Sequence, residues 1–580
     1  MSQNPNSIAT GAFVAALVAS GVRHACITPG SRSTPLTVAF ARHPGIKVWL
    51  HLDERSSSFF ALGLARATAA PVALVCTSGT AASNYHPAVV EANQSRIPLI
   101  VCTADRPQRL RDVGADQTID QVRMFGSNVR WAMDLALPSP SGPAPRYFEG
   151  CADRAVRSAM APLPGPVHLN FPFEEPLLPP PGELTTHANG STLSSAAIRP
   201  VSVAPDVDSV SAAVAALRGA RRPMIVAGPE TGGLPADAIV ALAARLDAPV
   251  LADPLSGVRL GPHDRSRVLD SYDALVRDPR ATNLPPDAVI RFGGVPTSKA
   301  LNQLLAGLGG TTQILCDHWG SWRDPEQVST HVVHGDAGLV AAALAEGVSG
   351  PGDPGWLSAW VERNGRARDA MQAATASFAE PFEGRVFTEL QSALPAGTTV
   401  VVGNSMPVRD ADSFLVSDAK PLAIVGNRGV NGIDGMTSTA LGAAASATGP
   451  VVMVIGDVSF YHDLNGLWAA KRHNLDLTIV LVNNNGGGIF HYLPQAAHDD
   501  IFEEWFGTPP DLDFAPVIGM YGGRHVVVED WGSFAGAASR PPAGLTVLEL
   551  RTDRAANTAM HRQAWSAAAE AAWGAATVAR

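Results

Sequence analysis

The stretch that decides the fold is Val451-Val-Met-Val-Ile-Gly-Asp-Val-Ser459 and, further along, Leu477-Thr-Ile-Val-Leu-Val-Asn-Asn-Asn-Gly-Gly-Gly488. Each part is a continuous apolar run that ends in polar residues and glycine, as strands do when helices cover both faces of a parallel sheet. Asp457 and Asn484 lie 27 positions apart, which is the length of one strand–helix–strand unit. We therefore expect both loops to leave the same edge of one sheet.

These two loops carry the ligand types of a metal–phosphate site. The Asp457 carboxylate, the Asn484 amide oxygen and a free backbone carbonyl near Gly486 are hard oxygen ligands, which suit Mg²⁺ bound to phosphate oxygens. The glycines allow the backbone to approach a diphosphate closely. The alternative is a polar strand end followed by an Asn-rich turn. The spacing of the two motifs favours the metal–phosphate site.

Similar apolar runs that end in polar residues or glycine occur along the whole chain, in three blocks. Two stretches rich in turn-forming residues divide them, a linker over residues 174–205 and a short seam over 348–355. Within each block, short apolar runs alternate with Ala-rich helical stretches. We expect an α/β protein with three doubly wound parallel-sheet domains, at residues 1–180, 200–348 and 356–580. The expected strands are 24–28, 72–76, 99–102 and 167–170 in the first block, 224–227, 250–252, 288–290 and 313–316 in the second, and 399–403, 451–455, 477–482 and 545–550 in the third.

Composition excludes several classes of protein. Of the 580 residues, 46% are apolar and 17% are charged, which excludes a disordered chain. The net charge of −10 argues against a nucleic-acid or anionic-membrane binder. We expect no membrane span, because no apolar run is long enough, and no signal peptide, because no basic region precedes the first apolar stretch. Five cysteines, scattered singly, fit a reducing, cytoplasmic location.

The Gly456-Asp457 motif followed by Asn483-Asn484 resembles the diphosphate and metal site of thiamine-diphosphate enzymes, and the three-block layout resembles their domain order. The resemblance implies a pyrimidine-binding, a central and a diphosphate-binding domain of that type. It implies thiamine diphosphate and Mg²⁺ (or Mn²⁺) as cofactors, with Asp457, Asn484 and Gly486 as metal ligands. The residues expected against the cofactor are Ser405, Met406, Ile433, Asp457, Ser459, Asn484, Gly486 and Ile489.

Such an enzyme also needs a glutamate at the ring nitrogen of the aminopyrimidine. That contact favours the imino tautomer, which removes the proton from the thiazolium carbon and makes this carbon a nucleophile. Glu54 is the candidate, because an apolar stretch delivers the pair Asp53-Glu54 and the family pattern places the glutamate second. The alternative is an acid pair that only favours a helix N-terminus, and Asp53 is the competitor for the catalytic role. Ile433, bulky among glycines, is the expected prop that bends the cofactor.

Five segments narrow the resemblance to the family of 2-succinyl-5-enolpyruvyl-6-hydroxy-3-cyclohexene-1-carboxylate synthases of menaquinone biosynthesis. They are Ile27-Thr-Pro-Gly-Ser-Arg-Ser-Thr-Pro35, Ala104-Asp-Arg-Pro107, Gly403-Asn-Ser-Met-Pro-Val-Arg409, Gly426-Asn-Arg-Gly-Val-Asn-Gly-Ile-Asp-Gly435 and Asn483-Asn-Asn-Gly-Gly-Gly-Ile-Phe490. This family decarboxylates 2-oxoglutarate and adds the succinyl-semialdehyde carbanion to isochorismate in a conjugate addition. The resemblance also implies a homodimer or a dimer of dimers, because in related enzymes the two cofactor-binding domains of one site come from different subunits.

Both substrates are dianions, so their pocket needs several cations, preferably guanidinium groups that bind a carboxylate with two hydrogen bonds. Only four of the 43 basic residues are lysines. By resemblance, Ser405, Arg409 and Arg428 would hold the succinyl end, and Phe490 would form a wall of the pocket with Ile489. The residues expected around isochorismate are Ser31, Arg32, Arg106, Gln117 and Lys299. For any single arginine or for Lys299, a solvated surface position is the alternative.

Two positions depart from the family pattern. Asp116 stands where relatives often have Asn, and an aspartate repels a dianion unless a neighbour such as Arg111 neutralises it. Ala300 stands beside Lys299 where some relatives carry an arginine. Binding of isochorismate is therefore less well supported by the sequence than binding of the cofactor.

Three other functions remain open. Another thiamine-diphosphate 2-oxoacid decarboxylase or carboligase, such as acetolactate synthase, is the nearest, although its pyruvate-like substrates do not require Arg409 and Arg428. A non-catalytic protein on the same fold does not require Glu54. A nicotinamide dehydrogenase requires a Gly-rich fingerprint after a strand, and Gly228-Pro-Glu-Thr-Gly-Gly233 only approximates one.

Overall fold

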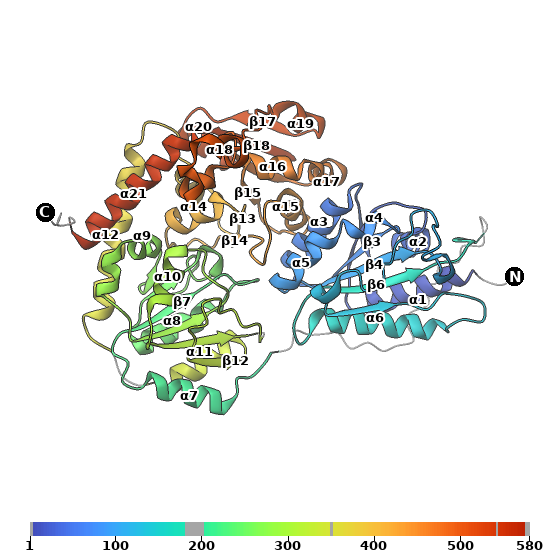
Figure 1. Cartoon of the computed structure of the whole chain (residues 1–580), viewed down its shortest axis with the longest axis horizontal. Coiled ribbons are helices and arrows are strands. Elements are labelled where there is room, and N and C mark those ends of the chain that lie inside the picture. The colour runs from blue at the N-terminus through green and yellow to red at the C-terminus, as the bar shows by residue number, and fades with distance from the viewer. Residues whose placement is uncertain (1–3, 180–201, 319, 349–351, 541–542, 575–580) are drawn as a thin grey trace.

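The structure is a computed structural model that describes residues 4–179, 202–318, 320–348, 352–540 and 543–574 of the 580-residue chain. It contains three parallel sheets of six strands each, all flanked by helices (Figure 1). This confirms the predicted α/β class with three doubly wound sheets. Most of the linker predicted over 174–205 lies outside the described residues, as does part of the seam over 348–355, so the domain boundaries stay a prediction.

The first sheet has the strand order β2-β1-β3-β4-β6-β5. Helices α1, α2 and α6 pack on one face, and α3 and α5 pack on the other. Its elements are α1 Pro5–Ala19, β1 His24–Ile27, α2 Thr34–Arg42, β2 Lys47–Leu50, α3 Glu54–Thr68, β3 Val72–Cys76, α4 Thr80–Ser83, α5 His86–Ser95, β4 Leu99–Asp105, β5 Trp131–Asp134, α6 Pro145–Met160 and β6 Val167–Pro172.

The second sheet has the order β12-β11-β10-β7-β8-β9, which differs from that of the first. Helices α7, α8 and α11 cover one face, and α9 and α10 lie on the other. Its elements are α7 Val207–Leu217, β7 Pro223–Ala227, α8 Ala236–Leu246, β8 Val250–Ala252, β9 Val268–Leu269, α9 Tyr272–Arg277, β10 Ala288–Phe292, α10 Lys299–Gly307, β11 Thr312–Asp317, β12 His331–His334 and α11 Ala337–Gly347.

The third sheet has the order β14-β13-β15-β16-β18-β17, which repeats the pattern of the first. Its first helix, α12, packs beside the last helix, α21, against α9 of the second sheet (Figure 1). Its elements are α12 Trp356–Ser377, α13 Arg385–Ala393, β13 Thr399–Val402, α14 Met406–Phe414, β14 Ala423–Val425, α15 Met436–Ala444, β15 Val451–Gly456, α16 Asp457–His462, α17 Leu467–His473, β16 Leu477–Asn483, α18 Asp499–Phe502, α19 Ala515–Met520, β17 Arg524–Val527, α20 Trp531–Ala538, β18 Leu545–Arg551 and α21 Arg554–Trp573.

All the predicted apolar runs coincide with strands, but the sequence analysis missed the two outermost strands of every sheet: β2 and β5, β9 and β12, β14 and β17. These edge strands are short, and most of them are incompletely buried. The predicted runs are therefore the four inner strands of each sheet, which helices cover on both faces.

Helices α3 and α15 join the first and third sheets through one continuous apolar core. Their backbones approach closely at two glycines. A Cβ atom at Gly63 would overlap the backbone of Thr439, and one at Gly442 would overlap the carbonyl of Phe60. The two sheets are thus connected by a helix contact that only glycine permits at these positions.

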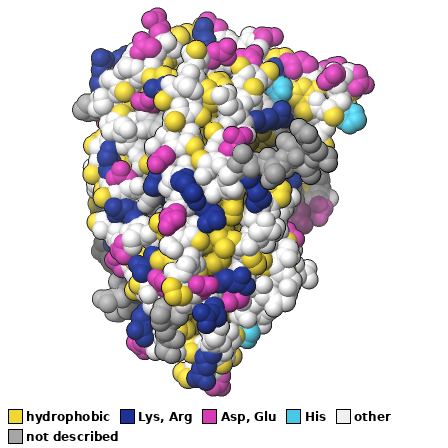
Figure 2. Space-filling view, turned by 90° about the vertical axis from the view of Figure 1, so that its left-hand side faces the viewer, with side chains coloured by type: hydrophobic (Ala, Val, Ile, Leu, Met, Phe, Trp, Pro, Cys, Tyr) yellow, Lys and Arg dark blue, Asp and Glu magenta, His cyan; other side chains and the backbone are white. Residues whose placement is uncertain are grey.

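The molecular surface carries charges of both signs. Figure 2 shows acidic and basic side chains interspersed over one face of the molecule, without a continuous basic stripe among the described residues of that face. Among the described helices, none is long and apolar enough to cross a membrane.

Candidate active site

The candidate site lies at the carboxyl ends of three adjacent strands of the third sheet. β13 pairs with β15, and β15 pairs with β16, all in parallel. The loops that follow these strands begin at Gly403, Asp457 and Asn484. In the order β14-β13-β15-β16, the chain adds β14 on one side of β13 and β15 on the other, so the strand order reverses between β13 and β15. Ligands of open α/β sheets bind outside the carboxyl ends of the strands at such a point.

These loops enclose a cavity of about 420 Å³. Every site residue predicted in the third block lines it, and no residue of the first sheet does. The predicted residues that line this cofactor cavity are Ser405, Met406, Arg409, Arg428, Ile433, Asp457, Ser459, Asn484, Gly486, Ile489 and Phe490.

Asp457 and Asn484 both line this cavity. The amides of Val458 and Gly486 each donate to the Asp457 carboxylate at 2.8 Å. Burial nevertheless raises the pKa of Asp457 to about 6, because these donors only partly replace water. The amide oxygen of Asn484 is buried and has no hydrogen-bond partner among the described residues.

A divalent cation would satisfy both groups, since it stabilises a buried carboxylate and accepts an amide oxygen as ligand. The described residues contain no cluster of three or more His, Cys, Asp or Glu side chains that could hold a metal. A cation at this position would therefore depend on the pair Asp457 and Asn484, on backbone carbonyls and on phosphate oxygens. The residues fit a metal that is bound together with a diphosphate.

Glu383 orients Asn484, and the sequence analysis missed it. The Asn484 side-chain amide donates to Glu383 Oε1 at 2.9 Å, and the Thr552 hydroxyl donates to the same oxygen at 2.8 Å. This contact turns the amide oxygen of Asn484 away from Glu383. Burial raises the pKa of Glu383 to about 7. Nothing in the local sequence indicates this role, because Glu383 follows no strand.

Asp410, His561 and the half-buried Tyr492 form a second group beside the cavity, which Asp410 lines. His561 Nε2 lies 2.8 Å from Asp410 Oδ1, and Tyr492 Oη lies 2.9 Å from His561 Nδ1. No histidine is predicted at the site from the sequence. His561 lies within the last helix, far from any motif, so no sequence signal identifies it.

Ser405 adopts a strained backbone conformation between β13 and α14, with φ of 68° and ψ of −128°. Such a conformation is rare for a residue with a side chain and persists only where surrounding contacts enforce it. The Arg409 guanidinium donates to the carbonyl of Ser405 at 2.5 Å and stabilises this turn. The strained turn places Ser405 and Arg409 on the same cavity wall.

Asn404 fixes the loop over residues 426–435, a role that its motif does not predict. Its amide nitrogen lies 2.9 Å from the carbonyl oxygens of Asn427, Asn431 and Gly432. Its amide oxygen accepts a hydrogen bond from Arg428 at 2.9 Å. The Ser459 hydroxyl donates to the carbonyl of Ile433 at 2.9 Å, so the loop is held from both ends.

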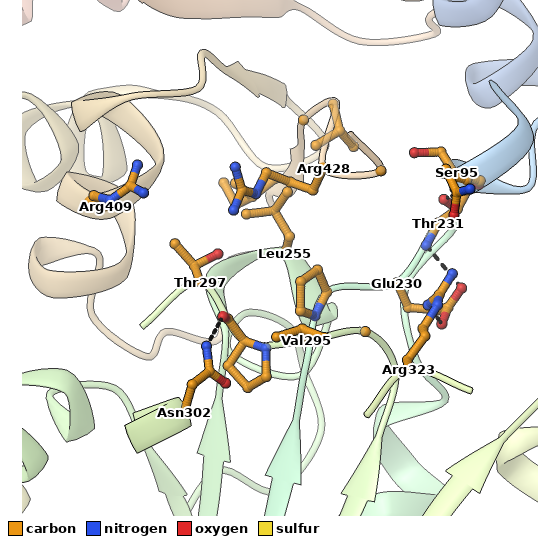
Figure 3. A pocket seen from close by; sticks show the side chains of 18 of the residues that line it. Ser95, Glu230, Thr231, Leu255, Val295, Thr297, Asn302, Arg323, Arg409 and Arg428 are labelled. Carbon is orange, nitrogen blue, oxygen red and sulfur yellow. Dashed lines mark hydrogen bonds and ion pairs between the residues drawn. The ribbon is translucent and has the colours of Figure 1, made fainter. Parts of the chain in front are cut away.

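A second cavity of about 710 Å³ lies where the three blocks meet (Figure 3). Arg409 and Arg428 line both cavities, and Lys299 lines the second, where α10 begins. Burial and the neighbouring Arg428 lower the pKa of Arg409. Figure 3 shows Arg409 and Arg428 on the side of the third block, opposite Thr297 and Asn302 of the central block.

The predicted site residues of the first block lie elsewhere, at the carboxyl edge of the first sheet. Arg106 donates to the Ser78 hydroxyl at 2.6 Å and to the carbonyl of Gln117 at 2.8 Å. Arg32 donates to the carbonyl of Phe173 at 3.1 Å, and Ser31 is exposed. Burial and the charge of Arg32 lower the pKa of Arg106. Ser31, Arg32, Arg106 and Gln117 line neither of the two cavities.

Arg111, the neighbour named as able to neutralise Asp116, pairs with two other carboxylates. It forms ion pairs with Asp105 and Asp134, at 2.8 and 2.9 Å. These partners end β4 and β5, the two strands on either side of β6, whereas Asp116 is exposed. Asp116 is one of three carboxylates that oppose the lowering of the Arg106 pKa by burial and by Arg32.

Asp53 and Glu54 occupy different positions at the start of α3. Asp53 is the N-cap, and its carboxylate accepts from the amides of Arg55 and Ser56, at 2.9 and 3.2 Å. Glu54 is the first helical residue and is half-buried. Burial raises the pKa of Glu54, which favours a carboxyl group able to share a proton with a ring nitrogen. Glu54 lines neither cavity of its own chain.

Two stretches of the chain match models of known protein families. Residues 9–124 match "Thiamine pyrophosphate enzyme, N-terminal TPP binding domain", and residues 411–540 match "Thiamine pyrophosphate enzyme, C-terminal TPP binding domain". A thiamin diphosphate-dependent enzyme from Mycobacterium smegmatis has a similar fold, with a TM-score of 0.70 over 95% of this chain and 100% of that chain, at 21% identity. The chain therefore shares the fold of that structure and matches both thiamine pyrophosphate binding domains in sequence.

Closer relatives share one name. The 2-succinyl-5-enolpyruvyl-6-hydroxy-3-cyclohexene-1-carboxylate synthase of Geobacillus kaustophilus is 50% identical over 573 residues, which cover 97% of each chain. The synthase of the same name from Chloroflexus aurantiacus is 46% identical and covers 96% of this chain and 95% of its own. This similarity confirms the family that the sequence motifs predict. The chain belongs to the 2-succinyl-5-enolpyruvyl-6-hydroxy-3-cyclohexene-1-carboxylate synthase family of thiamine-diphosphate-dependent enzymes.

Proposed function

We propose that this enzyme decarboxylates 2-oxoglutarate and transfers the remaining four-carbon unit to isochorismate, as a cytoplasmic step of menaquinone biosynthesis. One observation carries the choice of substrates: Arg409 and Arg428 line both the cofactor cavity and the adjoining cavity at Lys299. A dianionic acid that reacts at the cofactor and a second dianion beside it require cations at that shared wall. Pyruvate-like substrates of other thiamine enzymes do not require them.

Thiamine diphosphate fits the cofactor cavity, where Asp457, Asn484 and the carbonyl of Gly486 would hold Mg²⁺ or Mn²⁺ at its diphosphate. Ser405, Met406, Ser459 and Ile489 would contact the cofactor, and Ile433 would support its bent shape. When bound, the cofactor supplies a nucleophilic carbon and an electron sink for decarboxylation. The unpartnered amide oxygen of Asn484 and the raised pKa of Asp457 are the observations that support a metal here.

The chain's own residues bind and orient the two acids in this proposal. Arg409 and Arg428 hold the distal carboxylate of 2-oxoglutarate with Ser405, because neither guanidinium forms an ion pair with a described carboxylate. Phe490 lines the same cavity and excludes water. Isochorismate is held by Lys299 of the central block together with Ser31, Arg32, Arg106 and Gln117 of the first sheet.

We further propose that the working unit is a homodimer or a dimer of dimers. Glu54 must contact the aminopyrimidine of a cofactor whose diphosphate lies in the third block, yet Glu54 lines neither cavity of its own chain. A second chain that placed its first-sheet edge over the cofactor cavity would complete the site with its own Glu54, Arg32 and Arg106. A two-fold axis would then create two equivalent sites.

The test is a reaction with purified protein, thiamine diphosphate, Mg²⁺, 2-oxoglutarate and isochorismate, followed by mass spectrometry of the products. We expect loss of carbon dioxide and a product that combines the four-carbon unit with isochorismate. Pyruvate in place of 2-oxoglutarate serves as the control. Turnover of pyruvate but not of 2-oxoglutarate would refute the proposal and favour a carboligase of the acetolactate synthase type.

A further inference from the structure

Glu91 is a buried acid of the first block that none of the roles above uses. It lies in α5, and its side chain is 0% exposed. Its neighbours Val89 and Ala92 belong to the apolar core that joins the first and third sheets, so the helix is firmly packed. A carboxylate in such surroundings is costly to bury unless hydrogen bonds satisfy it.

The donors that satisfy Glu91 come from the loop that carries Arg428 and Ile433. The backbone amide of Gly429 donates to Oε1 at 3.0 Å, and those of Val430 and Asn431 donate to Oε2 at 2.7 and 2.9 Å. Three successive amides converging on one anion form a nest, which binds a carboxylate strongly. The contact joins residues more than 330 positions apart in the sequence.

Two neighbours on the first block complete this arrangement. The Ser95 hydroxyl donates to Glu91 Oε1 at 2.5 Å, and Arg66 lies 4.0 Å from the same oxygen while it donates to the carbonyl of Gly426. Gly429 is required for the close approach, because a Cβ atom there would lie 2.8 Å from Glu91 Oε2. Glu91 and Arg66 thus hold the loop at two points, ahead of Arg428 and after it.

We propose that Glu91 is a positioning residue for the donor acid and for the cofactor: it fixes the 426–435 loop so that Arg428 and Ile433 face the cofactor cavity. Asn404 holds the same loop from the inside, through carbonyl oxygens and Arg428. Glu91 holds it from the outside, through amides. The part of the proposal that concerns Arg428 rests on the proposed function, because it assumes that 2-oxoglutarate is the substrate. The part that concerns Ile433 needs only the cofactor.

The test compares Glu91→Gln with Asp287→Asn in the full-length enzyme. Asp287 is the matched control, because its carboxylate also accepts two backbone amides, those of Arg221 and Arg222, but far from the site. In Glu91→Gln we expect amide hydrogen exchange to rise about tenfold at residues 429–431, and the KM for 2-oxoglutarate to rise about tenfold with a smaller change in kcat. Asp287→Asn should leave both quantities unchanged.

A second variant tests the same contact from the loop. Gly429→Ala keeps the carboxylate but pushes the loop away from Glu91, so it should reproduce the rise in KM even where Glu91→Gln does not fold. Faster exchange without any change in KM or in thiamine-diphosphate affinity would overturn the positioning role. Unchanged exchange would show that Glu91 does not hold the loop.

Failure of the proposed function is distinguishable from failure of this inference. If the wild-type enzyme does not use 2-oxoglutarate, the proposed function fails. The effect of Glu91 on Ile433 is then tested by the affinity for thiamine diphosphate, measured by calorimetry with Mg²⁺. In that case Glu91→Gln should weaken cofactor binding severalfold relative to Asp287→Asn. Equal affinity of the two variants would overturn the inference.

Discussion

The first and third sheets share one strand order, yet different side chains stand at their carboxyl edges. The loops of the third sheet enclose a cavity with the oxygens of Asp457 and Asn484. The edge of the first sheet presents Glu54 and the guanidinium groups of Arg32 and Arg106, outside both cavities. The fold sets where a ligand binds, and the loop residues set which part of it binds. The edge of the third sheet encloses a cavity within the chain, whereas Glu54, Arg32 and Arg106 at the edge of the first sheet line neither of the two cavities.

The largest effect is expected at the edge of the third sheet, which encloses the cofactor cavity. Asp457→Ala removes the buried carboxylate that would bind the cation, so thiamine diphosphate should lose detectable affinity in the presence of Mg²⁺. Isothermal calorimetry measures this directly. The control is Arg32→Ala on the first sheet, which should retain cofactor affinity. Unchanged affinity in Asp457→Ala would refute the assignment of the third-sheet edge.

The next largest effect concerns Glu54. Glu54→Gln keeps the shape of the side chain but removes its acidity, so deuterium exchange at the thiazolium carbon should slow by orders of magnitude while cofactor binding falls only modestly. Proton NMR of the bound cofactor measures the exchange. Exchange at the wild-type rate would show that a residue other than Glu54 activates the cofactor.

Mixing variants sharpens the same comparison. If the two edges meet across a dimer, equimolar Glu54→Gln and Asp457→Ala chains should together regain roughly a quarter of the wild-type activity, because each mixed dimer has one intact site. Differently tagged chains show by pull-down that mixed dimers form. Mixed dimers that form and remain inactive would show that both edges act within one chain.

A smaller effect is expected at the shared cavity wall. Arg409→Ala should lower kcat/KM for 2-oxoglutarate about tenfold or more, since a hydrogen bond to a charged group contributes about 1.5–3 kcal/mol. Arg409→Lys should recover only part of the loss, because an ammonium lacks the planar fork of donors. Steady-state kinetics with each variant decides this. Unaltered kinetics in Arg409→Ala would exclude this arginine from substrate binding.

Metal binding at the edge of the third sheet should depend on pH. Burial raises the pKa of Asp457 to about 6, so the group is protonated below that pH and cannot bind a cation. Affinity for Mn²⁺ in the presence of cofactor should therefore rise as pH rises through about 6, and should fall about tenfold per pH unit below it. Electron paramagnetic resonance of free Mn²⁺ measures the affinity. A flat profile would mean that Asp457 does not titrate in this range.

The smallest effect is expected at Asp53, next to Glu54. Asp53→Ala removes the N-cap of α3 and should reduce stability by about 1 kcal/mol, whereas Asp53→Asn should have little effect, because asparagine caps equally well. Thermal unfolding measures both. Neither variant should slow proton exchange at the cofactor. Slowed exchange in Asp53→Asn would give this aspartate a part in the chemistry.

The inner strands of each sheet could be predicted from the sequence, and the outer strands could not. Inner strands such as β15 are buried on both faces, so their residues form continuous apolar runs. Most edge strands are more exposed: neither β5 nor β17 contains a fully buried residue. Their position depends on pairing with a neighbour, which no local pattern records.

The same physical difference applies to the candidate site. Asp457 and Asn484 follow inner strands, so their position at one edge could be inferred from chain order alone. Glu383, His561 and Glu91 act through contacts with residues distant in the sequence, and each lies in or beside a helix with no special motif. Asn404 stood within a quoted segment, but its contacts with the 426–435 loop depend on the folded backbone.

The glycine contact between α3 and α15 has a consequence for how two sites would work together. Glu54 is the first residue of α3, and α15 follows directly after the loop of Arg428 and Ile433. Because the two helices touch backbone to backbone, neither can shift without the other. In a dimer that shares its sites, each chain gives Glu54 to one site and the loop to the other. The helix pair then connects the two reaction centres rigidly. Closure of one centre around its substrate would therefore displace residues of the other.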